Sequence, residues 1–161
     1  MKPKKLSFAE FKHIYKRVPR LCVEVVIQSD KGVLLTKRSI EPLNGQWHIP
    51  GGTVLKGERI EQAVKRVAEE ELGVKIKIEK MIGIIEYTLE NYFSQPIGIA
   101  FLSKITSNNI HTDENSQEFG FFKIIPNNTV REQRMFLSKH FGLKVERKGK
   151  GKPELYDLAK K

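Results

Sequence analysis

The chain has 161 residues, a length that fits one domain with a substantial core. Its formal net charge of +10 favours anionic partners such as nucleotides, nucleic acid or acidic surfaces, although Lys and Glu richness is also common in thermophile proteins. The single cysteine, Cys22, excludes an intrachain disulfide, and no apolar run reaches the ~18–20 residues of a membrane span.

Apolar periodicity and turn residues predict a mixed α/β order. In chain order we expect a helix at about 7–17, strands at 21–28 and 33–38, a helix at 59–72, strands at 74–88, 97–106 and 119–125, and a helix from about 129 to 141. Ser7 and Glu10 have the spacing of a capping box for the first helix. Thr129 is expected to cap the last one, and Gly142 to end it.

The segments without regular structure are also predicted. The polar segment 107–117 is expected to be a loop. The first eight residues, MKPKKLSF, have charge but no apolar core, so we expect no signal peptide and a cytoplasmic protein. The basic, partly Gly-rich segment that begins at 144 is expected to be mostly disordered. Cys22 lies in the apolar run LCVEVVI and is expected to be a buried, inert thiol.

The helix at 59–72 has the strongest pattern in the chain. Apolar residues repeat every four positions from Ile60 to Leu72, and the last turn carries glutamates at 69–71. The negative end of the helix dipole disfavours acids there. Glu71 has Val67, not a basic residue, four positions earlier, and it borders the apolar stripe. A hard divalent cation would suit this carboxylate; a solvated acidic helix end is the alternative.

The same segment resembles the signature of the Nudix family, which is Gly, five residues, Glu, seven residues, then Arg-Glu-apolar-x-Glu-Glu-x-Gly-apolar. The matching positions are Gly52, Glu58, Arg66, Ala68, Glu70, Glu71, Gly73 and Val74. Val67 stands where the signature has glutamate. The resemblance implies an α/β/α sandwich with a mixed β-sheet and a loop-helix-loop motif, over residues 1–146, followed by a basic tail at 147–161.

The Nudix resemblance also implies a metal site with Mg²⁺ or Mn²⁺ as the cofactor. The Gly51 carbonyl, Glu70 and Glu71 would bind the metal, and Arg66 would orient the glutamates and support charge. The cation would neutralise diphosphate oxygens and stabilise the leaving group. A surface ion pair is the alternative role for Arg66.

Within the family, the chain is most similar to the GDP-mannose mannosyl hydrolase branch, in which one motif glutamate is lost. The similarity covers most of residues 6–125, including LLTKR (34–38) and ENYFS (90–94). By this match Arg38 would contact the diphosphate or leaving group, Glu24 the substrate, and Asn115 the metal. The alternatives are a surface arginine at a strand end, a structural ion pair for Glu24, and a solvated loop asparagine.

The general base is where the sequence departs from that branch. Ser116 aligns with the catalytic histidine of the branch, and Tyr87 with a second histidine. Serine is no general base near neutral pH without help. Glu118 and His111 are the candidate replacements, and Glu118 is the one that we include in the site. His48 is expected to face solvent rather than the site.

We expect metal-dependent hydrolysis of a GDP-mannose-like nucleoside diphosphate sugar, with release of GDP and sugar by attack at the anomeric carbon. One alternative is a conventional Nudix pyrophosphatase that attacks phosphorus in ADP-ribose, an NDP-sugar or a modified NTP. The other is a non-catalytic Nudix module that binds a nucleotide or RNA. The expected partner is a nucleoside diphosphate-linked small molecule; neither membrane nor nucleic acid is expected, and the branch implies a homodimer.

Overall fold

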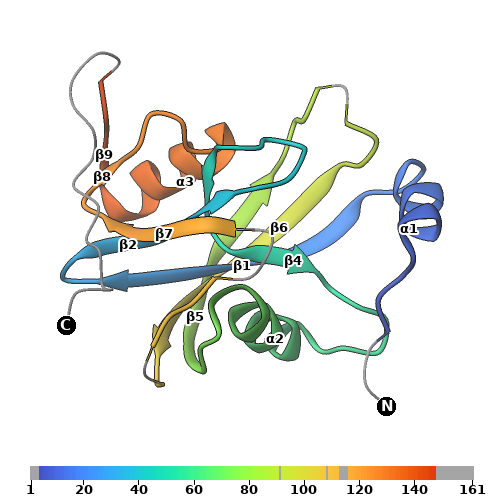
Figure 1. The fold of residues 1–161 in the computed structure, drawn as a ribbon, viewed down its shortest axis with the longest axis horizontal. Coiled ribbons are helices and arrows are strands. Elements are labelled where there is room, and N and C mark those ends of the chain that lie inside the picture. Colours follow the sequence, from blue (N-terminus) through green and yellow to red (C-terminus); the bar gives the residue numbers. More distant parts are fainter. Residues whose placement is uncertain (1–3, 91, 108, 113–115, 148–161) are drawn as a thin grey trace.

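The computed structural model describes residues 4–90, 92–107, 109–112 and 116–147 (Figure 1). The helices are α1 (Phe8–Tyr15), α2 (Ile60–Leu72) and α3 (Arg131–Phe141). The strands are β1 (Arg20–Ser29), β2 (Gly32–Arg38), β3 (Trp47–His48), β4 (Gly51–Thr53), β5 (Ile76–Glu86), β6 (Pro96–Ile105), β7 (Ser116–Phe122), β8 (Ile124–Ile125) and β9 (Lys144–Val145). No helix in these ranges is long and apolar enough to cross a membrane.

Strand β1 is the centre of a mixed sheet. It pairs in parallel with β6 and antiparallel with β2 and β4, and the sheet runs in the order β3-β2-β1-β6-β5, with β7 beside β2. In this register Glu24 lies opposite Gly51 of β4 on one side and opposite Ala100 of β6 on the other. The pairing therefore brings the only acid of β1 against the glycine turn that precedes α2.

Two apolar cores lie on opposite faces of the sheet, because successive side chains of a strand point to opposite faces. On β1, Val23 and Val25 pack in the core that includes the buried residues of α2. Val26 packs in the core that includes Phe136 and Leu137 of α3. Figure 1 shows α2 and α3 on opposite sides of the strands. The predicted α/β/α sandwich with a mixed sheet is confirmed.

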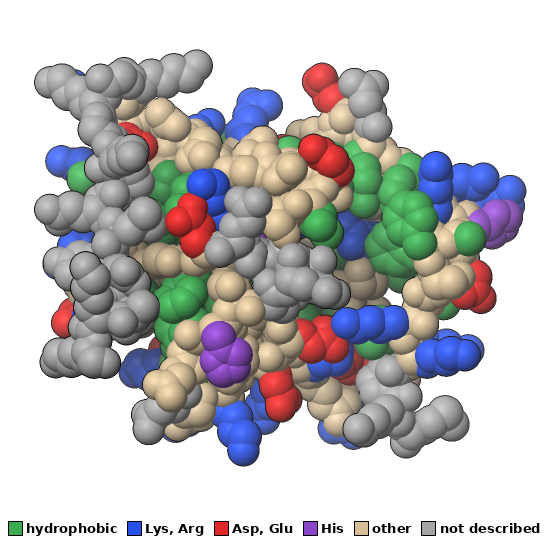
Figure 2. Space-filling view, viewed as in Figure 1, with side chains coloured by type: hydrophobic (Ala, Val, Ile, Leu, Met, Phe, Trp, Pro, Cys, Tyr) green, Lys and Arg blue, Asp and Glu red, His purple; other side chains and the backbone are tan. Residues whose placement is uncertain are grey.

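Helix α1 stands beside the sheet rather than on it. The predicted capping box is present, since Ser7 Oγ accepts from the Glu10 backbone and Glu10 accepts from the Ser7 backbone. The helix has no buried residue. Its aromatic side chains instead meet Phe93 in the β5–β6 connection, with ring centroids 6.0 Å apart for Phe11 and 6.2 Å for Phe8. Figure 2 shows hydrophobic side chains gathered beside α1, next to a basic rim.

The structure corrects three element predictions near the C-terminal end. The strand predicted at 119–125 is two strands, because β7 ends at Phe122 and β8 leaves the sheet to pair in parallel with β9. The N-cap of α3 is Val130, since Thr129 forms a bridge with Trp47 instead. Lys144 and Val145, expected in a disordered segment, form β9; residues 148–161 lie outside the described part.

We predict that Leu137→Ala will lower the free energy of unfolding by about 2–5 kcal/mol, because Leu137 is fully buried and its loss leaves a cavity between α3 and the sheet. The matched control is Met135→Ala on the same helix, where the side chain is 61% exposed, and we expect a change within about 0.5 kcal/mol. Urea unfolding followed by circular dichroism measures both. Equal losses in the two variants would contradict this packing.

Candidate functional site

Two cavities adjoin each other at the glycine turn, and they share the residues Arg20, Gly51 and Gly52. The first, called here the α2 cavity, has a volume of about 690 Å³ and is lined by residues of α1, β4 and α2. The second, called the Glu24 cavity, has a volume of about 290 Å³ and is lined by residues of β1, β2, the β2–β3 loop and α3. A ligand with two parts joined by a short bridge could occupy both.

The loop before α2 is fixed by Arg66. Its Nε and Nη2 donate to the two carboxylate oxygens of Glu58 at 2.7 and 3.0 Å, and Nη2 also donates to the Thr53 carbonyl at 2.9 Å. The Glu58 side chain is only 2% exposed, and it accepts a further bond from the Leu55 backbone at 3.1 Å. This bidentate pair is the strong form of an ion pair, and it holds β4 and α2 in one geometry.

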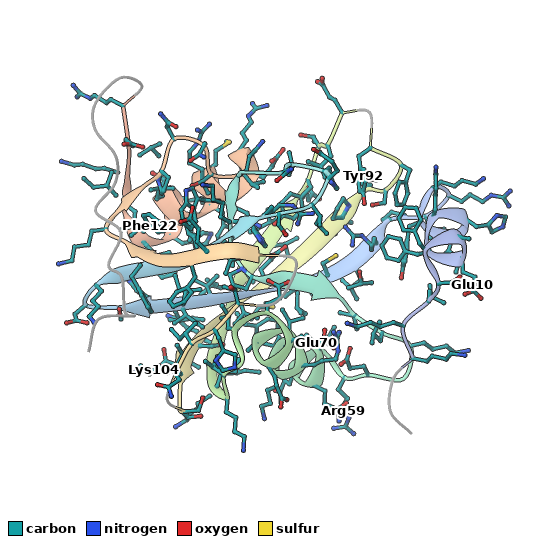
Figure 3. All side chains as sticks on the ribbon, viewed as in Figure 1. Glu10, Arg59, Glu70, Tyr92, Lys104 and Phe122 are labelled. Atoms are coloured by element: carbon teal, nitrogen blue, oxygen red, sulfur yellow. The ribbon has the colours of Figure 1, made fainter. Side chains whose placement is uncertain are left out.

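The predicted metal ligands converge on the α2 cavity. Gly51 of β4 and the carboxylates of Glu70 and Glu71 all line it. Glu70 Oε2 accepts from Arg66 Nη1 at 3.0 Å and from Lys5 Nζ at 2.9 Å. Figure 3 labels Glu70 on α2, on the side toward the N-terminal segment. The cations around Glu70 reduce the repulsion that two adjacent carboxylates would otherwise suffer.

This donor set fits a hard divalent cation. Mg²⁺ and Mn²⁺ take oxygen ligands from carboxylates and carbonyls, which are the groups that Gly51, Glu70 and Glu71 can offer. No group of three or more His, Cys, Asp or Glu side chains suited to a metal is found among the described residues. A metal here would therefore depend on the backbone carbonyl and on oxygens of a ligand or of water as well as on the two glutamates.

Glu24 is buried at the end of a hydrogen-bond chain that starts on α3. The Ile49 N–H donates to Gln133 Oε1, Gln133 Nε2 donates to the Tyr87 hydroxyl, and that hydroxyl donates to Glu24 Oε1, each at 2.7 Å. Burial raises the pKa of Glu24 to about 8, and the Tyr87 bond and the charges of Arg20 and Arg38 only partly oppose the rise. Glu24 is thus held by the neutral Tyr87 hydroxyl, and it forms no direct ion pair with another described residue.

Arg38 and His48 line the Glu24 cavity beside this chain. Arg38 Nε donates to the Pro42 carbonyl at 2.7 Å; burial lowers the pKa of the guanidinium, and the charge of Glu71 opposes that shift. His48 is 6% exposed, so its predicted solvent position is wrong. Thr36 donates to its Nε2, its Nδ1 donates to the Ile49 carbonyl, and burial and Arg38 lower its pKa to about 3.

The candidates for the general base are not brought together with these residues. Glu118 Oε1 accepts from Lys37 Nζ at 2.7 Å, and it lines neither cavity. The His111 ring packs over Gly73, where an added Cβ would meet its Nε2 at 2.3 Å. Asn115 lies outside the described residues, as does the side chain of Ser116. Glu118 as the general base therefore stays a prediction.

Sequence reasoning missed three residues that shape the site. Gln133 and Tyr87 carry the chain to Glu24, and Arg20 lies between the two cavities. Gln133 has no distinguishing signal in the sequence, since it is one polar residue in a polar helix. Tyr87 is signalled only by its alignment with a histidine of the resembling branch. Arg20, directly after Pro19, reads as an ordinary charge at the start of a strand.

Comparison with known proteins gives one family. A family model described as the NUDIX domain matches residues 18–139. The chain is similar to the low-salt glycan biosynthesis protein Agl8 of Haloferax volcanii, with 46% identity over 48% of this chain and 50% of the relative. It is also similar to the ADP-ribose pyrophosphatase of Methanocaldococcus jannaschii, with 29% identity over 66% of this chain and 63% of the relative. The matches thus span about half to two thirds of these relatives.

Among solved structures, the fold is similar to that of a MutT NUDIX hydrolase from Burkholderia pseudomallei. The TM-score is 0.70 and the sequence identity 26%, over 75% of this chain and 97% of the other.

We predict that Glu24 makes stability fall with rising pH. The folded pKa is about 8 and the ordinary value is 4.5, so between these values the folded state binds more protons than the unfolded state. The contribution is fully present below about pH 4.5 and is lost as the pH rises through about 8, with a slope of at most ~1.4 kcal/mol per pH unit.

Glu24→Gln removes this titration while keeping a hydrogen-bond acceptor for Tyr87. Urea unfolding of both metal-free proteins from pH 4.5 to 9 measures the difference between their free energies of unfolding. The lowered pKa of His48 makes stability rise with pH in both proteins, so its contribution cancels in this difference. Parallel stability curves for the two proteins would contradict the prediction.

Proposed function

Because this chain belongs to the Nudix family, we propose that it hydrolyses a GDP-mannose-like nucleoside diphosphate sugar with Mg²⁺ or Mn²⁺. Water would attack the anomeric carbon, and GDP and the free sugar would be released. The observation that carries this proposal is the shared junction of the two cavities. On one side of this junction are the carboxylates that line the α2 cavity, and on the other side is the Glu24 cavity, which Arg38 lines.

The roles of the residues follow from these positions. When bound, the metal would supply charge that stabilises the diphosphate leaving group. Glu70, Glu71 and the Gly51 carbonyl would hold it, and Arg66 keeps Glu70 and the loop in place. Arg38 would contact the diphosphate from the other cavity. Glu24, which is 5% exposed, would accept a hydrogen bond from the substrate or donate one to it.

Val67 supports a site with few metal ligands. Its side chain is 2% exposed in the core under the loop, and a Cβ on Gly52 would meet its Cγ2 at 2.9 Å. Val67 also lines the α2 cavity, where its apolar side chain offers no oxygen ligand to a cation. The apolar residue therefore limits the ligands of α2 to its last turn.

The substrate class has some support from the relatives. The name of the Haloferax volcanii protein places that protein in glycan biosynthesis, which agrees with a sugar-containing substrate for this chain. The name of the Methanocaldococcus jannaschii protein describes an ADP-ribose pyrophosphatase, which favours a second candidate function, attack at phosphorus in ADP-ribose or an NDP-sugar. Both candidates use the same metal site and a bridging diphosphate.

We predict that hydrolysis of GDP-mannose in ¹⁸O water with Mg²⁺ will give unlabelled GDP and labelled mannose, because attack at carbon places the water oxygen on the sugar. Mass spectrometry of both products measures the label. GMP with mannose 1-phosphate, or label in GDP, would place the attack at phosphorus and favour the second candidate. Absence of turnover with GDP-mannose, other NDP-sugars, ADP-ribose and NTPs would favour a binding module.

We also predict that Glu71→Gln will lower metal-dependent turnover by at least about 100-fold, since it removes a charged ligand that supports several kcal/mol of transition-state stabilisation. Glu69→Gln is the matched control, because Glu69 is an exposed neighbour on the same helix that lines neither cavity. Its rate should stay within about twofold of the parent. An unchanged rate for Glu71→Gln would overturn the metal assignment.

A further inference from the structure

Among the residues that the structure describes, Arg20 is the one charged residue that lines both cavities. It is the first residue of β1, opposite Pro96 of β6, and its side chain extends toward β4. Any ligand that occupies both cavities must pass this side chain and the two glycines beside it. The charge of Arg20 therefore bears on which chemical group can join the two parts of such a ligand.

The contacts of Arg20 orient its guanidinium without neutralising it. Nη1 donates to Thr53 Oγ1 at 3.1 Å, and the guanidinium carbon lies 5.2 Å from the centroid of the Phe11 ring. Nε is buried and has no hydrogen-bond partner in the part of the chain that the structure describes. No carboxylate there forms an ion pair with Arg20.

Arg66 offers a contrast within the same site. It has a bidentate carboxylate partner in Glu58, as a structural arginine requires when it is mostly buried. Arg20 has a neutral hydroxyl and an aromatic face instead. A guanidinium that these two contacts hold in place, with donors still to satisfy, is pre-organised for an anionic ligand.

A second guanidinium lines the Glu24 cavity with Arg20. Arg38 reaches it from β2, and the positive charge of Arg20 adds to burial in lowering the pKa of Arg38. The two like charges therefore repel each other across the cavity. A bridging anion between them would relieve that repulsion and would satisfy the remaining donors of both.

We propose that Arg20 binds the diphosphate bridge of the substrate at the junction of the two cavities, with the nucleoside in one cavity and the second moiety in the other. A planar guanidinium can donate in parallel to two phosphate oxygens, which an ammonium group does less well. The proposal rests on the proposed function in taking the ligand to be diphosphate-linked. It holds for attack at carbon and at phosphorus alike.

Phe11 supports this role as a positioning residue. The guanidinium carbon of Arg20 lies 5.2 Å from the centroid of the Phe11 ring, a cation–π contact that favours this position of the arginine side chain. Helix α1, which has no buried residue, thereby gains a function in the site. Phe11→Leu should weaken ligand binding less than removal of the guanidinium does.

The test compares Arg20→Gln, Arg20→Lys and Phe11→Leu with the matched control Arg17→Gln, an exposed arginine that lines neither of the two cavities. Calorimetric titration with Mg²⁺–GDP and Mg²⁺–ADP gives the Kd, and titration with Mn²⁺ alone reports the metal site. We expect Arg20→Gln to weaken binding of the diphosphates by about tenfold or more, and Arg20→Lys to have a Kd between those of the parent and Arg20→Gln. Arg17→Gln should bind the diphosphates with the Kd of the parent, and all variants should bind Mn²⁺ as the parent does.

Three binding results would overturn the proposal. The first is a Kd for the diphosphates that Arg20→Gln leaves unchanged. The second is failure of the parent protein to bind either diphosphate. The third is an equal loss of affinity in Phe11→Leu and Arg20→Gln together with an equal fall in Tm, which would make Arg20 a support for α1 alone.

Measurements of turnover distinguish failure of the role proposed for Arg20 from failure of the proposed function. If the parent hydrolyses none of the nucleotides but Arg20→Gln still weakens diphosphate binding, the proposed function fails and the role of Arg20 stands. If the parent hydrolyses a nucleoside diphosphate sugar and Arg20→Gln leaves KM unchanged, the role of Arg20 fails alone.

Discussion

The bidentate ion pair between Arg66 and Glu58 joins the loop after β4 to the middle of α2. With one partner 2% exposed and the other 20% exposed, removing either would leave a poorly solvated charge, which is strongly destabilising. The further bond from Arg66 to the Thr53 carbonyl fixes the glycine turn to the same point. The Gly51 backbone and the carboxylates at the end of α2 can face one cavity only because this connection holds them in register.

Strand β1 brings the second half of the site to the same turn, and glycines make that approach possible. An added Cβ on Gly51 would meet Glu24 Oε2 at 2.3 Å, and one on Gly98 would meet Oε1 at 2.5 Å. Glycine is thus required on both neighbouring strands by the buried carboxylate between them. The chain of hydrogen bonds through Tyr87 and Gln133 then links Glu24 to α3, so both helices that cover the sheet contribute to the position of one acid.

What the sequence predicts well is local. Helix α2 forms where its apolar spacing predicts it and ends before Gly73, which is in the left-handed conformation. The motif spacing also brings Gly51, Glu70 and Glu71 to one cavity. Partners that are distant in the chain escape prediction: Ile49 and Gln133 are separated by 84 residues, and His48 is buried because Thr36 of the neighbouring strand supplies its hydroxyl. The residue pattern within one helix or strand does not indicate which distant residues will contact it.

Val67 shows how a substitution inside a motif can change chemistry without changing the fold. Its side chain occupies the core between α2 and the sheet, in contact distance of the glycine turn, so the helix gains apolar packing where the signature has an acid. That exchange removes a negative charge beside Glu70 and Glu71. In the proposed reaction the site would then need fewer cations for neutrality, and the arginines would neutralise more of the diphosphate charge. The positions of Arg20 and Arg38 at the junction of the cavities, on strands outside the motif, fit that division of charge between metal and protein.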